Sequence, residues 1–369
     1  MTDTERELAP NPPEQPDLEL SVIIPARNEE RSLPACLASL LIQSEPGFLL
    51  GQQWELIVVN DDSTDRTCEI AAEAAATHDG VILLHAPPLD LSERGGFTGK
   101  SNACWTGAQK ARGRHLLFTD ADTIHEPSDI SRSLREADRH KAALLSYSPR
   151  QIVTGFWQHA VMPLVFSELA SVYPSKEVND PMRSLAAANG QFILIERDAY
   201  FSVGGHRAIG KDILEDVALA RNIKHSDRLL RFRYAPEALS TRMYQTTAEM
   251  IEGWTKNLAL LFDNALALAL WRALDILLLA GLPILSIELW NARFAAHSVQ
   301  WLGAGWVLAL LWVRTVVRFY MRVAKSNFPL IDCLLAPLGL PLFVVLLYRS
   351  WFQHRILKRV SWKGREYAG

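Results

Sequence analysis

The sequence predicts an α/β domain with a mainly parallel sheet, followed by a group of long apolar helices. Between residues 20 and 122, short apolar runs alternate with longer segments of helical periodicity. This alternation is typical of a parallel sheet with helices on both faces. From residue 257 to residue 350, Leu, Ala, Val and Trp crowd the sequence instead. We therefore expect a globular domain and then a membrane region, with the boundary between residues 245 and 257.

Two successive β-then-α units begin the predicted sheet. The run LSVIIP from Leu20 is apolar and is stopped by Pro25, and residues 31–43 then have apolar side chains at helical spacing. The same order returns in WELIVVN (residues 54–60) and in the Ala-rich helix expected over residues 65–77. Each strand is thus expected to lie parallel to the one before it.

The next part of the chain continues this order. VILLHA (residues 81–86) is a third strand, residues 100–112 form a third helix, and RHLLFTDAD (residues 114–122) is a fourth strand. Three polar clusters follow the strand ends: Asn28-Glu29, Asn60-Asp61-Asp62 and Asp120-Ala121-Asp122. Because ligands of open α/β sheets bind at the carboxyl ends of the strands, these clusters predict one binding site. Asp and Asn are also common helix N-caps, which is the interpretation we favour for Ser63 and Asp65.

Composition excludes several classes of protein. The net charge of −3 gives no general attraction to nucleic acid, so we expect no nucleic-acid partner. Residues 1–19 are acidic and proline-rich and lack an apolar core, which predicts a disordered tail and not a signal peptide. The four cysteines are far apart and form no C-x-x-C pair, so we expect buried thiols and neither a zinc site nor disulfides.

The D-A-D cluster has the chemistry of a site for a divalent cation. Asp120 and Asp122 are two residues apart at the end of an apolar strand, so in an extended backbone both carboxylates point to the same side. Mg²⁺ and Mn²⁺ prefer oxygen ligands, and Mg²⁺ is usually held by one or two carboxylates together with substrate phosphates. A D-x-D pair is common by chance, so the cluster gains weight only from the motifs around it.

Those motifs resemble the family 2 glycosyltransferases of the GT-A fold. PARNEE, VVNDDSTD, TGKSNA, TDAD, AAANGQFILIERDAY, GG and ILEDVALAR occur in the order and approximate spacing of that family, over residues 20–254. The resemblance implies a hexosyltransferase that takes a sugar from a nucleotide-diphosphate sugar, such as a UDP-sugar, with Mg²⁺ or Mn²⁺ as cofactor. It also implies transfer in a single displacement, which inverts the anomeric centre.

The resemblance also implies the residues of the donor site. Asp61 of VVNDDSTD matches the aspartate that contacts the base, and Asn60 replaces the Asp that the family often has before it. The nucleoside pocket is expected to be lined by Pro25, Ala26, Asn28 and Glu29. Lys100 of TGKSN is expected to meet the pyrophosphate as a point charge, although an ordinary surface lysine is an equal alternative. Asp120 is placed near the ribose and Asp122 on the metal.

The acceptor side of the site is expected to follow from two further motifs. Asp216 of ILEDVALAR matches the family's general base, which takes the proton of the acceptor hydroxyl. Acidic residues also favour the first turn of a helix through its dipole, which remains the simpler explanation for Glu215. Residues 186–191 (AAANGQ) resemble the loop in which small residues bring the backbone close to the sugar. We do not assign His206 to the site, because an isolated loop histidine is usually a surface residue.

The C-terminal part is expected to associate with a membrane. Residues 271–290 and 301–320 are apolar and long enough to cross a bilayer as a helical hairpin, with Trp290, Trp301 and Trp306 at the interface. Buried helices of a soluble domain are the alternative. A third apolar stretch, residues 329–348, is interrupted by charge, Gly and Pro and is interpreted as a span or a re-entrant hairpin.

Basic residues predict the orientation. Arg314 and Arg318 lie near the end of the second stretch, Arg322 and Lys325 follow it, and the C-terminal tail is rich in Lys and Arg. These residues place the catalytic domain on the cytoplasmic side of an inner membrane. The expected divisions are an acidic tail (1–19), a GT-A catalytic domain (20–245), an amphipathic interfacial helix (246–270), a membrane region (271–350) and a basic cytoplasmic tail (351–369).

Within the family, the chain most resembles the hopene-associated and carotenoid-type enzymes, through VYPSKEVNDP, AAANGQ and GKDILEDVALAR. This implies a lipid-like or polyisoprenoid-type acceptor that is dissolved in the membrane. A processive polysaccharide synthase is one alternative, but the segment EGWTKN lacks the Q-x-x-R-W motif of such enzymes. A catalytically silent scaffold is another, and the presence of both Asp122 and Asp216 counts against it.

Overall fold

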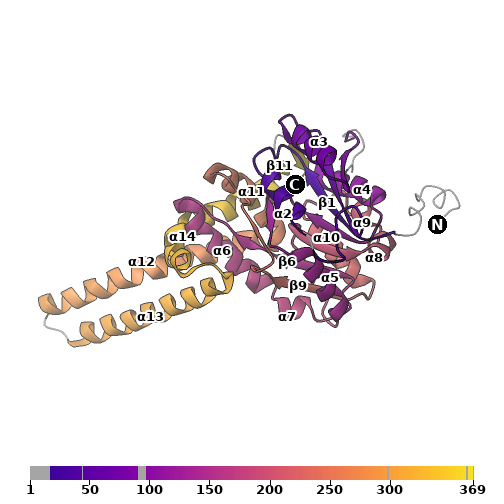
Figure 1. The fold of residues 1–369 in the computed structure, drawn as a ribbon. Helices are drawn as coiled ribbons and strands as arrows, with labels where there is room; N and C mark the ends of the chain where they lie inside the picture. The colour runs from indigo at the N-terminus through magenta and orange to yellow at the C-terminus, as the bar shows by residue number, and fades with distance from the viewer. Residues whose placement is uncertain (1–16, 44, 90–96, 297–298, 363–364, 369) are drawn as a thin grey trace, which may run out of the picture. The chain divides into compact units, whose positions relative to one another are not determined.

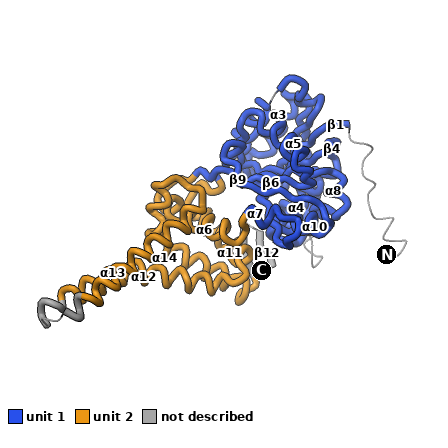
Figure 2. Tube along the Cα trace, turned by 90° about the horizontal axis from the view of Figure 1, so that it is seen from below, with its two compact units in different colours: residues 1–152, 175–242 blue, residues 153–174, 243–369 orange. Residues whose placement is uncertain are grey.

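The protein is described here by a computed structural model, which covers residues 17–43, 45–89, 97–296, 299–362 and 365–368. The chain divides into two compact units, one of residues 1–152 with 175–242 and the other of residues 153–174 with 243–369 (Figure 2). The single catalytic domain expected over residues 20–245 is therefore interrupted, since one internal segment groups with the C-terminal helices. Most of the expected acidic tail lies outside the described residues.

The first unit is built on a mainly parallel sheet of seven strands (Figure 1). In order across the sheet, the strands are β3 (Val81–His85), β2 (Trp54–Asn60), β1 (Leu18–Ala26), β4 (Gly113–Thr119), β8 (Phe192–Glu196), β6 (Leu144–Ser148) and β9 (Leu230–Tyr234). All neighbours pair in parallel except β8, which is antiparallel to both β4 and β6. A second sheet contains β5 (Thr123–His125), β10 (Leu239–Thr241) and β7 (Arg150–Gln151). The predicted α/β class is confirmed.

Helices connect these strands much as the periodicity predicts. Those of the first unit are α2 (Leu33–Leu41), α3 (Thr67–Thr77), α4 (Gly99–Lys110), α5 (Asp129–His140), α7 (Ser175–Val178), α8 (Arg197–Ser202), α9 (Gly205–Ala208) and α10 (Glu215–His225). The start of α4 is fixed by Thr98, whose side chain accepts a hydrogen bond from the backbone N–H of Ser101. Its first turn therefore has a defined position at the sheet edge.

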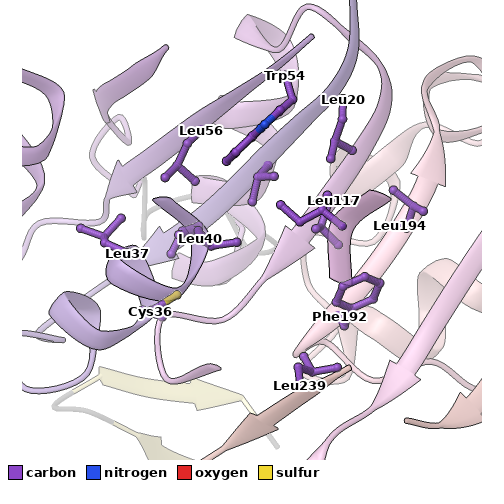
Figure 3. Packing of buried hydrophobic residues seen from close by; sticks show 14 of the residues in the cluster. Leu20, Cys36, Leu37, Leu40, Trp54, Leu56, Leu117, Phe192, Leu194 and Leu239 are labelled. Atoms are coloured by element: carbon purple, nitrogen blue, oxygen red, sulfur yellow. The ribbon is translucent and has the colours of Figure 1, made fainter. Parts of the chain in front are cut away.

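The core of this unit is apolar and fully enclosed. Trp54 and Leu20 from neighbouring strands, Leu117 of β4 and Phe192 of β8 lie in one cluster with the inner face of α2 (Figure 3). The four strand residues expose 1% or less of their surface. Burying side chains of this size is worth roughly 1.5–3 kcal/mol each. The core therefore holds rigid the strand ends from which the polar clusters project.

The second unit consists mainly of helices. They are α6 (Phe156–Val172), α11 (Thr247–Leu261), α12 (Ala265–Ala296), α13 (Val299–Val323) and α14 (Leu330–Phe352), with short turns η1 (Ala324–Ser326) and η2 (Gln353–Leu357) and the hairpin of β11 (Arg359–Trp362) and β12 (Arg365–Ala368). The helices α12 and α13 run side by side as a long hairpin (Figure 1). The third apolar stretch forms the single continuous helix α14, so a re-entrant break within it is wrong.

Tight packing explains why α14 continues through Pro337 and Pro341. The helix lies against α6 and α11, and a Cβ on Gly339 would overlap the backbone carbonyl of Ala160 in α6. Freed backbone groups in apolar helices are tolerated where neighbouring helices cover them. The expected interfacial helix corresponds to α11, and its residues Met250, Trp254 and Leu258 are buried in the core of this same unit.

A group of charges joins three helices of the second unit. Arg272 of α12 lies 3.0 Å from the carboxylate of Glu168 in α6, and Arg322 of α13 lies 2.6 Å from that of Asp275 in α12. Arg272 also reaches Asp275, at 3.1 Å. Two acids and two bases thus compensate one another, which lowers the cost of placing these charges beside apolar helices.

Two of these helices, over Ala265–Asn291 and Leu330–Leu357, are long and apolar enough to cross a membrane. The predicted pair was α12 and α13, but α13 carries Arg314, Arg318 and Arg322 and does not meet the same criterion. Only 11% of the most apolar window of α12 is buried within the protein, against 44% for α14. Length and composition therefore weakly suggest a membrane association, chiefly through the exposed apolar surface of α12.

Candidate active site

The predicted site residues lie in the first unit, at the end of β1, in the loops that follow β1, β2 and β4, and in the first turns of α4 and α10. They fall into two groups. One group comes from the end of β1 and the loops after β1 and β2, and it contains Ala26, Asn28, Glu29 and Asp61. The other is a cluster of charged residues, which come from α4, from α10 and from the loop after β4. It contains Lys100, Asp120, Glu215 and Asp216. Pro25, also in β1, lines a small cavity together with residues of this second group.

Hydrogen bonds tie the end of β1 and the segment after it to the loop after β2 and to the start of α3. The N–H of Asp61 donates to the carbonyl of Ala26 (2.9 Å), and the N–H of Glu29 donates to the hydroxyl of Thr67 (2.7 Å). Asn28 has a φ of +53°, which few residues other than Gly, Asn and Asp adopt, and its side-chain oxygen accepts from the N–H of Thr64 (2.9 Å). Asn28 thus shapes the loop, and that role explains its residue type without a ligand.

Asp61 is buried just after the end of β2, and its contact with a base stays a prediction. Only 5% of its surface is exposed, and Arg27 donates to its carbonyl oxygen (2.8 Å), which fixes its backbone. Asn60 stands where the family often has its first Asp. Its side-chain oxygen accepts a hydrogen bond from the N–H of Ser63 (3.2 Å), within the same loop.

The second group centres on Lys100. Its ammonium nitrogen lies 2.7 Å from Asp120 Oδ1 and 2.9 Å from Glu215 Oε1, so it bridges two carboxylates that are far apart in sequence. Burial alone lowers the pKa of Lys100, but Asp120 and Glu215 outweigh it and raise the pKa well above the usual value. Lys100 is therefore a fixed positive charge, and the alternative of an ordinary surface lysine does not describe this geometry.

Asp216 lies next to this bridge in the first turn of α10. Its two carboxylate oxygens accept hydrogen bonds from the N–H of Gly190 (2.9 Å) and from its neighbour Val217 (2.8 Å). Burial and then the charge of Glu215 raise the pKa of Asp216 to about 6, although Lys100 and the two backbone donors act in the opposite direction. A carboxylate with a pKa near the working pH is suited to general base catalysis.

The backbone of the AAANGQ segment approaches these charges closely at Gly190. A Cβ at this position would lie 2.8 Å from Lys100 Nζ and 3.3 Å from Glu215 Oε1. Any side chain here would therefore displace the bridge or the backbone that donates to Asp216. The requirement for glycine at this position follows from the neighbouring charges, and the approach of this loop to a sugar stays a prediction.

Asp122 is held from the opposite side of the D-A-D turn. Its carbonyl accepts from the hydroxyl of Thr241 (3.3 Å) and from the N–H of Arg242 (3.4 Å). Among the described residues, no group of three or more His, Cys, Asp or Glu side chains could enclose a metal ion. The available ligands are carboxylates, so the donor set fits a hard cation that takes its remaining ligands from a substrate.

Sequence reasoning left out two residues of this cluster. His206 is buried, and with Lys100, Asp120, Gly190 and Glu215 it lines a cavity of about 10 Å³, close to the space that one water molecule needs. Burial lowers the pKa of His206 to about 4, so the ring is neutral at physiological pH. A lone histidine after a Gly pair carries no signal of this. Glu215 was explained by the helix dipole alone, whereas its pairing with Lys100 depends on the tertiary structure.

Comparisons with known proteins agree with this architecture. Residues 21–203 match the model of the glycosyl transferase family 2. The chain is 28% identical over 359 residues to the 4,4'-diaponeurosporenoate glycosyltransferase of Staphylococcus aureus strain USA300, covering 95% of this chain and 88% of the relative. The enzyme of that name from strain MRSA252 is 27% identical over the same length.

Among solved structures, a mannosyltransferase from Pyrobaculum calidifontis, in complex with GDP-Man and Mn²⁺, aligns with a TM-score of 0.52 at 19% identity. The alignment covers 95% of this chain and 90% of that one. At this identity the likeness concerns the fold, and it confirms the GT-A architecture expected from the sequence.

Proposed function

Because the chain belongs to glycosyl transferase family 2 and uses a nucleotide sugar, we propose that it transfers the sugar to a lipid-like acceptor in a single inverting displacement. The observation that carries this proposal is the position of Asp216 at the end of the charge cluster, with a pKa raised to about 6 by burial and by Glu215. Asp216 is the general base that accepts the proton of the acceptor hydroxyl. The hydroxyl then attacks the anomeric carbon opposite the nucleotide.

The donor is a UDP-sugar in this proposal. Asp61 contacts the base beside the loop that holds Pro25, Ala26, Asn28 and Glu29. Lys100 moves from its carboxylate partners to the pyrophosphate, for which a partly exposed ammonium is a suitable counter-ion. The Pyrobaculum mannosyltransferase was solved with GDP-Man, so guanine donors belong in any screen.

Asp122, with Asp120 beside it, holds Mg²⁺ or Mn²⁺ in this proposal. When bound, the cation offsets the charge of the diphosphate as it leaves. The support is the carboxylate donor set and the Mn²⁺ in the mannosyltransferase of the same fold. The hydrogen bonds to the Asp122 carbonyl fix the backbone of this residue.

The acceptor is lipid-like, and the site of action is the cytoplasmic face of an inner membrane. One relative is named for 4,4'-diaponeurosporenoate, a carotenoid, which is an acceptor of this class. The exposed apolar surface of α12 gives the protein a means to reach such a molecule. The orientation in this proposal is supported by the basic residues Arg314 and Arg318 of α13 and by the basic C-terminal tail, since such residues favour the cytoplasmic side.

A donor screen tests the proposal. Purified, detergent-solubilised protein is mixed with UDP- and GDP-sugars, Mg²⁺ or Mn²⁺, and a carotenoid acid or another polyisoprenoid lipid, and the released nucleotide is measured. We expect release with one donor class, dependent on the lipid and absent in Asp216→Asn. No lipid-dependent release with any donor would contradict the proposal, and a long polymeric product would favour a processive synthase instead.

A further inference from the structure

A chain of buried polar side chains lies directly behind the D-A-D turn, and no part of the proposed chemistry uses it. His125 of β5 donates or accepts through both ring nitrogens. Its Nδ1 lies 2.9 Å from Asp129 Oδ2, and its Nε2 lies 3.1 Å from Thr119 Oγ1 and 3.3 Å from Thr123 Oγ1. The two threonine hydroxyls are 2.9 Å apart. We call these four residues the Thr-His-Asp network.

The network is costly to bury. The side chains of His125 and Asp129 expose 0% and 1% of their surface. Buried polar pairs of this kind are often replaced by apolar residues without loss of stability. The backbone pairing of β5 with β10, which places Thr123 opposite Thr241, already secures the strand without these side chains. Stability alone is therefore a poor explanation for the network.

What the network holds is the backbone of the site. The hydroxyl of Thr123 donates to the carbonyl of Asp120 (2.7 Å), and the hydroxyl of Thr119 donates to the carbonyl of Gln191 (2.9 Å). Asp120 begins the D-A-D turn, and Gln191 follows the glycine whose N–H donates to the proposed base. One set of hydroxyls thus fixes both the cation side and the acceptor side of the site.

A second series of hydrogen bonds connects Gln191 to Asp122. The amide of Gln191 donates to the hydroxyl of Thr241 (3.1 Å), and that hydroxyl donates to the carbonyl of Asp122 (3.3 Å). The carbonyl of Asp120 therefore accepts from a threonine that contacts His125, and the carbonyl of Asp122 accepts from a threonine that contacts Gln191. The imidazole ring is thus connected through hydrogen bonds to the backbone carbonyls of both aspartates.

We infer that His125 and Asp129 are positioning residues, which orient Thr119 and Thr123 so that Asp120 and Asp122 are set for a nucleoside diphosphate with its cation. The inference rests on the proposed function of the D-A-D turn. Groups that orient the ligands of a metal typically change its affinity 10- to 100-fold when they are replaced. The network touches neither donor nor acceptor, so its effect is expected on cation-dependent binding and not on the nucleoside contacts.

The test compares binding with and without a cation. Calorimetry on the full-length, detergent-solubilised protein measures the affinity of UDP and of GDP, each in Mn²⁺ and in EDTA, and the nucleotide that wild type binds more tightly is then used. Thr123→Val removes a hydroxyl without changing size, and His125→Gln removes the ring. In both variants, the gain in affinity on adding Mn²⁺ should be roughly tenfold smaller than in wild type. The affinity measured in EDTA should change less than about twofold.

Two controls separate positioning from folding. Ser133→Ala removes a buried hydroxyl of α5 that donates only to Ile130, so it should leave the Mn²⁺ gain unchanged. The double variant Thr123→Val with His125→Gln should lose no more than the worse single variant, because both act through one path. Lower melting temperatures with an unchanged Mn²⁺ gain would overturn the inference. If wild type binds neither UDP nor GDP under any condition, the proposed function itself fails.

Discussion

Lys100 Nζ lies 2.9 Å from Glu215 Oε1, and this pair joins the first turn of α4 to the first turn of α10. Both residues start helices, yet neither is explained by helix capping alone. Lys100 at a helix start is unfavourable to the dipole, and Glu215 exposes only 8% of its surface. The pair places a cation beside the proposed base, where in our proposal a diphosphate replaces the two carboxylates as the partner of Lys100.

Replacing Lys100 is expected to weaken donor binding. In Lys100→Met the apolar stem remains but the charge is lost, and a charged hydrogen bond of this kind is worth roughly 10- to 100-fold in affinity. Calorimetry with UDP and with uridine distinguishes the two ends of the donor, and only UDP should bind more weakly. Lys110→Met, an exposed change in the last turn of the same helix, is the matched control. Equal loss for uridine would contradict a role at the pyrophosphate.

Local patterns were sufficient to predict much of this site. The strands β1, β2 and β4 are continuous apolar runs that end in polar residues, so their ends and the D-A-D turn could be placed from the sequence. The start of α10 could be placed because Glu215 and Asp216 precede an apolar periodicity. Each of these features depends on residues within about ten positions of one another, which is the range that propensity and periodicity describe.

Long-range contacts could not be predicted in this way. Residues 153–174 are apolar on all sides of the helix, a pattern that does not say which partner covers them, and they group with the C-terminal helices. The prolines of α14 suggested a break, but packing against α6 keeps the helix continuous. The bridge of Lys100 to Asp120 and Glu215 and the contacts of His125 join distant segments, and no local pattern contains them.

Removal of the divalent cation is expected to abolish turnover and to weaken nucleotide binding together. Asp122 offers a single carboxylate with few other protein ligands near it. We therefore expect the diphosphate to supply ligands to the cation, and the cation to strengthen binding of the diphosphate. Titration of UDP in Mn²⁺ and in EDTA, with Asp122→Asn beside wild type, measures this coupling. Asp122→Asn should lose the Mn²⁺ effect while its melting temperature stays near that of wild type. Turnover that is unchanged in excess EDTA would end this idea.

The pH dependence of kcat/KM is expected to follow Asp216. Burial and Glu215 raise its pKa from 3.8 to about 6, and the base must be ionised to act, so activity should fall as the pH drops through 6. Glu215→Gln removes a charge that raises this pKa, so the midpoint should move to lower pH. Lys100→Met removes a charge that lowers it, so the midpoint should move to higher pH. Shifts in the same direction for both variants would contradict the assignment.

Membrane topology is expected to leave both ends of the chain on the cytoplasmic side. Because α12 and α13 run side by side as a hairpin, we expect them to cross together or not at all, although only α12 and α14 are apolar enough by themselves, and 44% of the most apolar window of α14 is buried. Single cysteines at Asp3 and Gly369, introduced without the four native cysteines, should be equally protected from an impermeant thiol reagent in spheroplasts. Labelling of the two ends from opposite sides would require an odd number of crossings and would place α14 across the bilayer.

Replacing the proposed general base, Asp216, is expected to lower the rate of transfer without weakening donor binding. A positioned carboxylate that takes the proton of the acceptor in the transition state is worth roughly 10²–10⁴-fold in rate. Asp216→Asn keeps the size of the side chain and its place beside Gly190, so it should reduce transfer by this factor. Its affinity for the nucleotide sugar should stay near wild type. Asp61→Ala should behave in the opposite way, since the loss of a contact to the base weakens donor binding first.

Glu215→Gln provides the comparison that isolates Asp216. Glu215 shares the helix turn and the charge of Asp216 but points its carboxylate at Lys100, so its loss should act on donor binding and on the pH midpoint more than on the maximal rate. Single-turnover rates at saturating donor, measured above pH 7 where the base is ionised, compare the two variants directly. A rate for Asp216→Asn close to that of Glu215→Gln, or a product that retains the anomeric configuration of the donor, would falsify the assignment of Asp216 as the base of an inverting transfer.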